Sequence, residues 1–300
     1  MNKIIIAGGT GYLGNILSSY FIKESYNVTI ITRGNSKTEN KINYINWDDN
    51  WQSALESSKA IINLTGKSIN CLFTANNKKA IIESRLTATK KINLAILQCN
   101  NPPEVFINAS GASIYKCSFD KTHDEYNEDF GNSFLTEVCK QWETEFYKKT
   151  TPNTRKVAIR ITPVLGKESH AIKPLKKVVA LGLGGKQGHG KQYFSWIHET
   201  DFIKAIQFII DTKKICGTVN LTSPNAITNH FFMQSFRKAM RIPFGIPTPS
   251  LLLHLSKYVT KVEPELILDS IRIYPKKLEE FDFEFDYGTI EKALEEIVKK

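Results

Sequence analysis

A glycine-rich turn near the start of the chain carries the clearest chemical signal in the sequence. Gly8, Gly11 and Gly14 fit the spacing GxxGxxG, and Gly9 with the last two fits GxGxxG. Glycines at these spacings let the backbone approach a dinucleotide's pyrophosphate, and a following helix N-terminus presents free N–H groups to it. The sequence predicts a nucleotide-binding turn rather than an ordinary glycine-rich one. Its expected contact residues are Gly8, Thr10, Gly11, Tyr12, Leu13 and Gly14.

The end of the next apolar segment bears on which dinucleotide binds. Residues 27–32 (NVTIIT) read as a buried strand, and the chain continues Thr32-Arg33-Gly34, with no acid between Glu24 and Glu39. An NAD site usually has Asp or Glu here for the ribose 2′-hydroxyl, whereas an arginine can pair with a 2′-phosphate. We therefore expect Thr32 and Arg33 to contact NADP(H). The alternative is that Arg33 is a solvated loop charge.

The surrounding elements alternate between strand and helix. Apolar residues recur with helical spacing over 13–21 and 135–146, and a long helix is expected from about 76 to 98. The pattern predicts strands at 3–7, 27–32, 42–46, 60–64, 105–109, 157–161 and 217–221. Such alternation is typical of an α/β, Rossmann-type doubly wound parallel sheet, which binds ligands at the carboxyl ends of its strands. The remaining contacts expected there are Leu64, Thr65, Gly66, Ala109 and Ser110.

After residue 166 the alternation breaks. Residues 182–190 hold five glycines in nine positions, which predicts a mobile loop, either a lid or surface slack. From about residue 224 onward, helical pieces are interrupted by prolines. We expect a nucleotide-binding domain over 1–165, to which 194–222 returns, and a smaller, mainly helical substrate domain made of 166–193 and 223–300.

Composition excludes several classes of protein. The net charge of +10 raises the question of nucleic acid or acidic lipid, but the lysines are scattered and no basic run alternates with aromatic residues. The five cysteines form no CxxC pair, and no metal-ligand cluster is visible, so we expect no disulfide framework and no metal. The N-terminal apolar run is too short for a signal peptide, and no stretch approaches the roughly 18 apolar residues of a membrane span. We expect a cytoplasmic protein without nucleic-acid or membrane partners.

Several further motifs carry a family resemblance across nearly the whole chain. They read INLTG at 62–66, INASGASIY at 107–115, FLTEVCKQWE at 134–143, IRITPVLGK at 159–167 and YPKKL at 274–278. With GGTGYLG at 8–14, the chain resembles the extended short-chain dehydrogenase/reductase superfamily of NAD(P)-dependent epimerase/dehydratase type. It is most similar to an epimerase-like subfamily with a small C-terminal domain of unknown function. The resemblance implies a Rossmann domain and a C-terminal substrate domain that closes over the nucleotide.

The superfamily's catalytic pattern is not matched. Its proton-transfer chemistry uses a Ser or Thr and a Tyr-x-x-x-Lys, whose tyrosine gives or takes the proton. Counting back from Glu143 places Leu135 at the tyrosine position and Cys139 at the lysine position, and Gly111 falls at the serine position. None of these three side chains is the usual acid or base, so the resemblance implies cofactor binding without the ordinary mechanism.

Other residues could supply the chemistry. Tyr115 is a candidate proton donor, unless its ring packs in the core, and His198 is a candidate pocket residue, unless it ends a strand and caps a helix. Arg85 could hold an anionic ligand or be a surface charge, and Cys139 is expected to be a small core side chain.

Two functions follow from these residues. The first is an NADP(H)-binding, epimerase-like oxidoreductase that exchanges hydride with an unidentified small molecule. The second is a non-catalytic NADP(H)-binding sensor or scaffold. The sequence leaves the substrate and the oligomeric state open.

Overall fold

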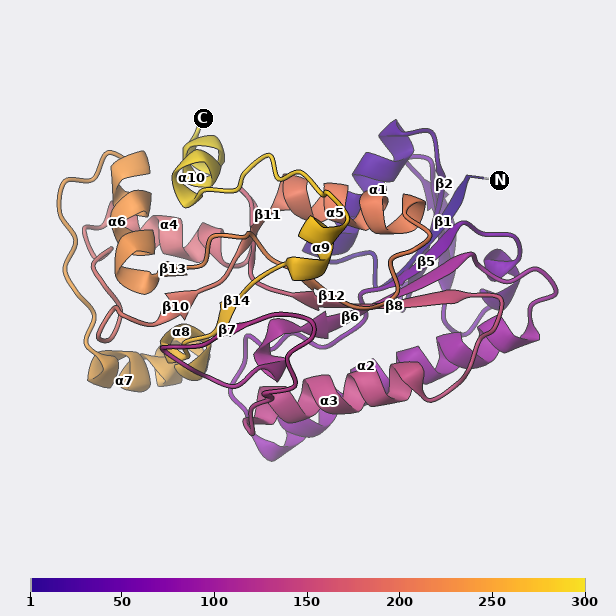
Figure 1. Ribbon diagram of the computed structural model, residues 1–300, viewed down its shortest axis with the longest axis horizontal. Coiled ribbons are helices and arrows are strands. Elements are labelled where there is room, and N and C mark those ends of the chain that lie inside the picture. Colours follow the sequence, from indigo (N-terminus) through magenta and orange to yellow (C-terminus); the bar gives the residue numbers. More distant parts are fainter. Residues whose placement is uncertain (1, 300) are drawn as a thin grey trace.

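An eight-stranded sheet forms the centre of the molecule (Figure 1). The computed structural model describes residues 2–299, without the side chains of positions 259 and 260. The strand order is β12-β8-β6-β5-β1-β2-β4-β3, and every neighbouring pair is parallel except β3 and β4. The strands are β1 (Lys3–Ala7), β2 (Asn27–Thr32), β3 (Lys37–Glu39), β4 (Ile42–Asn46), β5 (Ala60–Asn63), β6 (Val105–Gly111), β8 (Arg155–Ile161) and β12 (Gly217–Leu221). This order confirms the doubly wound α/β prediction.

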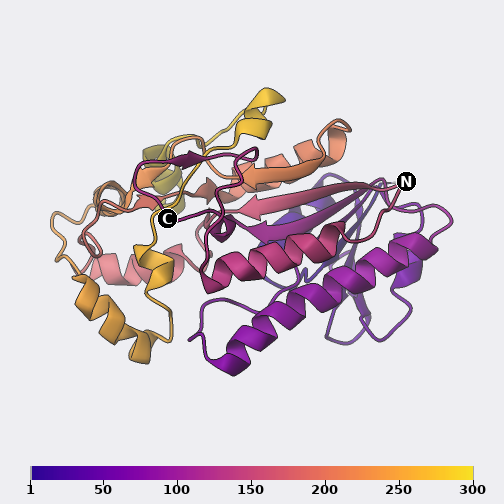
Figure 2. The same cartoon turned by 60° about the horizontal axis from the view of Figure 1, so that its bottom comes forward.

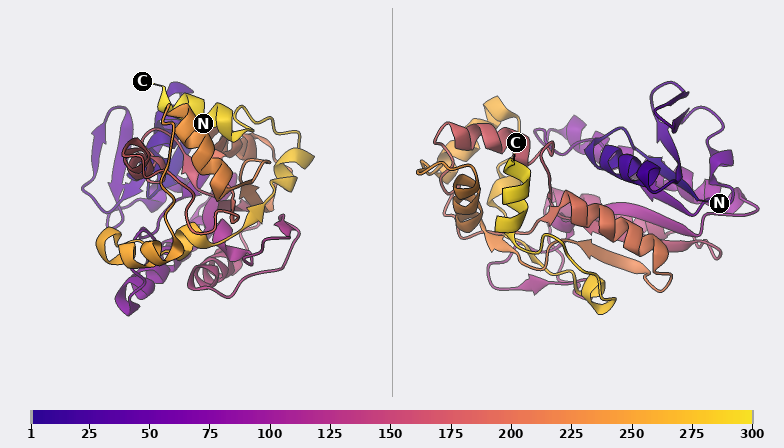
Figure 3. Two further views of the ribbon diagram at one scale, coloured as in Figure 1. Left: turned by 90° about the vertical axis from the view of Figure 1, so that its left-hand side faces the viewer. Right: turned by 90° about the horizontal axis from the view of Figure 1, so that it is seen from above.

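Helices cover both faces of the sheet, which explains why its central strands carry apolar side chains on both sides. Ile4, Ile5 and Ile6 are all fully buried although they alternate between the two faces. On one face lie α1 (Tyr12–Lys23) and α5 (Glu199–Asp211), side by side in the right-hand view of Figure 3. On the other lie α2 (Ala75–Gln98) and α3 (Phe134–Tyr147), which run along each other in Figure 2.

The later part of the chain builds a lobe at one end of the sheet, seen end-on in the left-hand view of Figure 3. Its apolar core includes the buried side chains of Trp196, Phe232, Phe236 and Leu294. The helices of this region are α4 (Ile172–Ala180), α6 (Asn229–Ala239), α7 (Ser250–Thr260), α8 (Glu265–Leu268) and α10 (Ile290–Val298). The helix α9 (Lys276–Glu280) lies instead against β12, and its Leu278 belongs to the core of the main sheet. β12 returns to the main sheet beside β8, whereas the domain boundaries at 165, 194 and 222 stay predictions.

The structure also contains short elements, most of which the sequence pattern did not indicate; the strand end at His198 is an exception, because it is one of the two alternatives given for that residue. A strand of only two residues is too short to show a periodic pattern of apolar residues. The three residues of β3 are all exposed, so this strand has no apolar face that the sequence could reveal. The two-residue strands are β7 (Thr122–His123), β9 (Val164–Leu165), β10 (Tyr193–Phe194), β11 (Ile197–His198), β13 (Ile227–Thr228) and β14 (Arg272–Ile273). The 3₁₀ turns are η1 (Gln52–Leu55), where the sequence predicts a short helical piece near residues 52–57, and η2 (Ala112–Ile114), which it does not predict.

The glycine-rich segment 182–190 is tied down rather than slack. Residues 182–188 and 246–248 exchange four backbone hydrogen bonds of 2.8–3.1 Å, and the Gln187 N–H donates to Asn229 Oδ1 at 2.8 Å. A Cβ on Gly185 would overlap the Ile246 backbone, so glycine permits this close approach. The prediction of a mobile loop is corrected to a hydrogen-bonded strap. Within residues 2–299, no helix combines the length and apolar character needed to cross a bilayer.

Candidate functional site

The glycine turn between β1 and α1 has the geometry that a phosphate-binding loop requires. Gly8 adopts φ +78°, and a Cβ there would meet the Thr65 nitrogen at 2.9 Å, so only glycine fits without strain. A Cβ on Gly14 would overlap the main chain of Gly9, which shows how tightly α1 sits against the turn. Both positions depend on the absence of a side chain.

The N-terminus of α1 is open to a ligand. Gly11 is the N-cap residue and provides no side-chain hydrogen bond to the first turn, which also contains no acidic residue. A Cβ on Gly11 would find only the Gly8 carbonyl oxygen, at 3.9 Å, so free space lies in front of this residue. Uncapped N–H groups and the positive end of the helix dipole favour an anion here.

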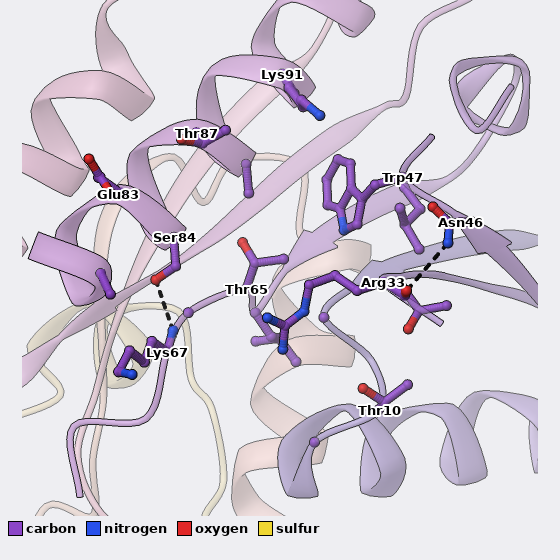
Figure 4. Close-up of a pocket in the computed structure, with 18 of the residues that line it drawn as sticks. Thr10, Arg33, Asn46, Trp47, Thr65, Lys67, Glu83, Ser84, Thr87 and Lys91 are labelled. Carbon is purple, nitrogen blue, oxygen red and sulfur yellow. Dashed lines mark hydrogen bonds between the residues drawn. The ribbon is translucent and has the colours of Figure 1, made fainter. Parts of the chain in front are cut away.

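A cleft of about 990 Å³ opens in front of this turn (Figure 4). It lies at the carboxyl ends of β1, β2, β4 and β5 and is closed on its outer side by α2. Eight of the predicted contact residues line it: Gly8, Thr10, Gly11, Thr32, Arg33, Leu64, Thr65 and Gly66. Figure 4 shows the Arg33 side chain extending from the end of β2 into the cleft.

Four other predicted contact residues, Leu13, Gly14, Ala109 and Ser110, are not among the residues that line the cleft. Leu13 packs against the apolar core beneath α1, and Gly14 forms the close contact with the turn. Ala109 and Ser110 are buried near the end of β6, where the Ser110 hydroxyl donates to Glu143 Oε1 at 2.6 Å.

Tyr12 points away from the turn toward α5. Its hydroxyl forms a short hydrogen bond to the Glu199 carboxylate. Burial raises the pKa of both groups, and the carboxylate raises that of the phenol further. Gly166 lies so close to this pair that a Cβ there would overlap both side-chain oxygens. Tyr12 therefore links the nucleotide turn to the later part of the chain.

Arg85 lies on α2 directly against the cleft wall. Its guanidinium carbon would be 3.0 Å from a Cβ on Gly66, and Nη1 donates to the carbonyl oxygens of Lys67 (3.1 Å) and Ile81 (2.9 Å). The guanidinium also stacks over the Trp142 ring, 4.9 Å from its centroid. Burial lowers its pKa. These contacts make Arg85 a brace between α2, α3 and the loop after β5.

The sequence interpretation missed the contribution of the next strand. Asn46, Trp47 and Asp48, at the end of β4, line the cleft beside Arg33. From α2, the cleft is lined by Glu83, Ser84, Thr87 and Lys91 among others. The Lys91 ammonium lies 5.8 Å from the centroid of the Trp47 ring. The usable signal was that residues 42–46 read as a parallel strand, whose carboxyl end must reach the same sheet edge.

Tyr115 is held in a buried polar network and also lines the second cavity, described below. It is 1% exposed, and its hydroxyl lies 2.8 Å from both Arg160 Nη1 and Asn220 Oδ1 and 2.9 Å from the Asp124 carbonyl oxygen. Burial raises the pKa of its phenol to about 12, although Arg160 opposes the shift. These surroundings favour the packed-tyrosine interpretation, and a catalytic role for Tyr115 stays a prediction.

Arg160 connects this tyrosine to α3. It forms a bidentate ion pair with Glu143, with two nitrogen–oxygen distances of 2.9 Å, and both side chains are largely buried. Burial disfavours the charged guanidinium, but the carboxylate outweighs it and raises the pKa of Arg160. The pair fixes α3 against β8.

The position expected for a catalytic serine faces the position expected for a lysine. A Cβ on Gly111 would lie 2.8 Å from Cys139 Sγ, so the thiol fills the space that a serine side chain would need. Cys139 is 5% exposed, and burial raises its pKa to about 12. This thiol is a packed core side chain, as expected, and not a thiolate. Leu135 is buried on the same helix.

His198 caps a helix and joins it to the end of the chain. Its Nδ1 accepts from the Thr200 N–H at 3.2 Å, which leaves Nε2 as the donor to Glu296, also at 3.2 Å. The ring stacks on Tyr287 with centroids 3.8 Å apart and is 1% exposed. Burial lowers its pKa, while Glu296 opposes this. The geometry is that of the helix-cap alternative, and a pocket role for His198 stays a prediction.

A second cavity of about 660 Å³ lies at the N-terminus of α3 and is called the α3 cavity below. Its wall is polar and carries charges of both signs: Lys78, Lys116, Glu263, Glu265 and Asp269, with Ser113, Asn132, Ser133 and Thr136 beside them. Phe73 and Phe134 form an edge-to-face pair in it. Among residues 2–299, no group of three or more His, Cys, Asp or Glu side chains is placed to hold a metal ion.

Comparison with known proteins places the chain in a family. The model of the NAD dependent epimerase/dehydratase family matches residues 4–221, and a domain of unknown function, DUF1731, matches residues 249–297. An epimerase family protein of Staphylococcus saprophyticus is 32% identical over 300 residues, which cover 99% of this chain and 100% of that protein. One from Staphylococcus haemolyticus is 30% identical, with 99% of each chain covered.

A solved structure is also similar over the whole length. The crystal structure of human epimerase family protein SDR39U1 (isoform 2) with NADPH matches with a TM-score of 0.89 and 26% identity, covering 98% of each chain. The chain belongs to the NAD dependent epimerase/dehydratase family, within the extended short-chain dehydrogenase/reductase type, and has a Rossmann fold and a DUF1731 C-terminal domain.

Proposed function

We propose that this chain binds NADP(H) and works as an epimerase-like oxidoreductase on an unidentified small molecule. The observation that carries the proposal is Arg33, which extends into the glycine-turn cleft from the end of β2. Residues 33–38 contain no acid, so no carboxylate in this loop competes for the guanidinium or repels a 2′-phosphate. The similar human protein was solved with NADPH, which supports the same choice.

The cleft fits such a cofactor. The N–H groups of the turn and of the α1 N-terminus would hold the pyrophosphate, and Arg33 would hold the 2′-phosphate. Leu64, Thr65 and Gly66 would form the opposite wall. When bound, the nicotinamide ring supplies or accepts a hydride. The protein's own contribution is to bind, orient and shield the reacting groups.

We place the substrate in the α3 cavity. Its lining of hydroxyl, amide and charged groups suits a small polar molecule better than an apolar one. Leu135 and Cys139 can neither donate nor accept a proton usefully, because one is a hydrocarbon and burial raises the pKa of the other to about 12. A proton for the substrate would come instead from another side chain of this wall: Tyr115, Lys78, Lys116 or a carboxyl group. Neither a nucleic acid nor a membrane is part of the proposal.

The second candidate is an NADP(H)-binding sensor or scaffold without catalysis. The packing of Cys139 against Gly111 favours it, because the space where a serine would polarise a substrate is filled by an inert thiol. The two candidates share the cofactor and differ in turnover.

The first experiment measures cofactor choice. Purified protein is titrated with NADPH and NADH, and Arg33→Asp is compared with Lys37→Asp. Lys37 is an exposed cation that pairs with Glu39, so its substitution matches the charge change outside the cleft. We expect tighter binding of NADPH by the native chain, a reversed preference in Arg33→Asp and a retained one in Lys37→Asp. Unchanged relative affinities in Arg33→Asp would contradict the NADP(H) assignment.

The second experiment separates the enzyme from the sensor. Oxidation of bound NADPH is followed with a panel of carbonyl compounds and sugar nucleotides. Turnover that is lost when the α3 cavity is blocked, for example by Ser113→Trp, supports the oxidoreductase. Tight NADPH binding without turnover across the panel supports the sensor.

A further inference from the structure

The Asn46 side chain is hydrogen-bonded to the backbone of the Arg33 loop. It is the last residue of β4 and pairs in register with Thr32, the last residue of β2. Its Nδ2 donates to the carbonyl oxygens of Arg33 (3.3 Å) and Gly34 (2.8 Å), and the first of these bonds is drawn in Figure 4. Its Oδ1 accepts from the Asp48 N–H at 2.8 Å. One side-chain amide therefore joins the ends of two neighbouring strands.

These bonds determine which way the loop's peptide groups face. Carbonyl dipoles that point at a phosphate repel it, and here two of them are occupied by the Asn46 amide. Because a trans peptide directs its N–H opposite to its C=O, the N–H of Asn35 is turned away from Asn46. The Gly34 N–H is bound by Thr32 Oγ1 at 3.2 Å, so the start of the loop is also fixed.

The rest of the loop is anchored without the Asn46 side chain. The Asn46 backbone N–H donates to Ser36 Oγ at 2.8 Å, and Ser36 in turn bonds the Asp49 carboxylate. The pairing of β3 with β4 is also a backbone feature. Removing the side-chain amide should therefore loosen residues 33–34 and leave the hairpin and the sheet folded.

We propose that Asn46 is a positioning residue for cofactor choice: it holds the backbone at residues 33–34 so that the Arg33 guanidinium meets the 2′-phosphate of NADP(H). The inference rests on the proposed NADP(H) function and adds the residue that makes Arg33 effective. A guanidinium on a loose loop must be ordered when the phosphate binds, which weakens binding, whereas one on a fixed loop is already in place. In this proposal the contact acts on the 2′-phosphate, so ligands without that phosphate should depend on it less.

The test measures dissociation constants by calorimetry for NADPH, NADH, adenosine 2′,5′-bisphosphate and AMP. The proteins are the native chain, Asn46→Ala, Arg33→Ala and the double variant, with Asn43→Ala as a control. Asn43 is an exposed asparagine of the same strand whose side-chain contact, at 3.5 Å, is to Thr38. Thermal unfolding of each variant shows that it is folded.

We expect Asn46→Ala to weaken the binding of NADPH and of adenosine 2′,5′-bisphosphate about tenfold. The binding of NADH and of AMP should weaken less than about twofold. Because Asn46 acts through Arg33, adding Asn46→Ala to Arg33→Ala should cost almost nothing more. Equal weakening of all four ligands, or additive effects in the double variant, would overturn the inference. Asn43→Ala should behave as the native chain does.

The outcome also separates this inference from the function on which it rests. A native chain that binds NADH as tightly as NADPH contradicts the proposed NADP(H) function itself. A native chain that prefers NADPH, loses the preference in Arg33→Ala and keeps it in Asn46→Ala contradicts the role of Asn46 alone.

Discussion

Two glycines of the same turn should respond in opposite ways to the same added methyl group. A Cβ on Gly14 would come closer than 3.0 Å to the Gly9 backbone, a separation that real Cβ atoms essentially never show. Since the obstacle is main chain and not a flexible side chain, α1 itself must shift. Overpacking of this kind costs up to about 3 kcal/mol. Gly14 lies within α1, so alanine recovers about 1 kcal/mol of helix propensity.

The expected net loss for Gly14→Ala is therefore about 2 kcal/mol, the difference between overpacking and helix propensity. At roughly 2–4 °C per kcal/mol, the melting temperature should fall by about 4–8 °C. Gly11→Ala is the matched control for stability. Gly11 has φ −84°, which alanine adopts freely, and its Cβ would meet nothing closer than 3.9 Å. Its melting temperature should stay within about 2 °C of the native value.

For NADPH binding, in contrast to stability, Gly11→Ala should be a damaging substitution. The open space at Gly11 is where the pyrophosphate would approach. The methyl group of Gly11→Ala should therefore weaken the binding of NADPH at least about tenfold, although the protein keeps its native stability. The assays are thermal unfolding without ligand and calorimetric titration with NADPH. A native melting temperature for Gly14→Ala would refute the packing argument. Native NADPH affinity for Gly11→Ala would refute the placement of the pyrophosphate.

Two further predictions concern buried titratable side chains away from the cleft. Glu143→Gln leaves the buried Arg160 guanidinium without its carboxylate and should lower the free energy of unfolding in urea by about 3–5 kcal/mol, and a loss below about 1 kcal/mol would contradict the ion pair's role. His198→Asn keeps a cap for the Thr200 N–H but removes a ring whose pKa is lowered by burial. Since protonation of that ring favours the unfolded chain, the native protein's stability relative to His198→Asn should be greatest above pH 6.5 and fall as the pH drops toward 5; a pH-independent difference would contradict this.

Local patterns in the sequence determined the core of the fold. Each central strand is a short apolar run, and the first turn combines three glycines with a helix start, so their identity depends on neighbours within a few residues. For the same reason Arg33 could be assigned to the cleft from its position after the second strand, and the structure places it there.

Contacts between residues that lie far apart in the sequence determined the surroundings of the remaining candidate residues. Tyr115 and Asn220 are 105 residues apart, and His198 and Glu296 are 98 apart, so burial of the two candidate catalytic side chains left no local trace. The glycines at 182–190 indicated flexibility, but this segment is held by backbone hydrogen bonds to residues 246–248, which are distant in the sequence. The antiparallel pairing of β3 with β4 brings Asn46 next to the Arg33 loop, and the pattern of apolar residues does not predict this pairing. Secondary structure follows from local residue order, whereas the partners of polar side chains are set by which chain segments the tertiary fold brings together.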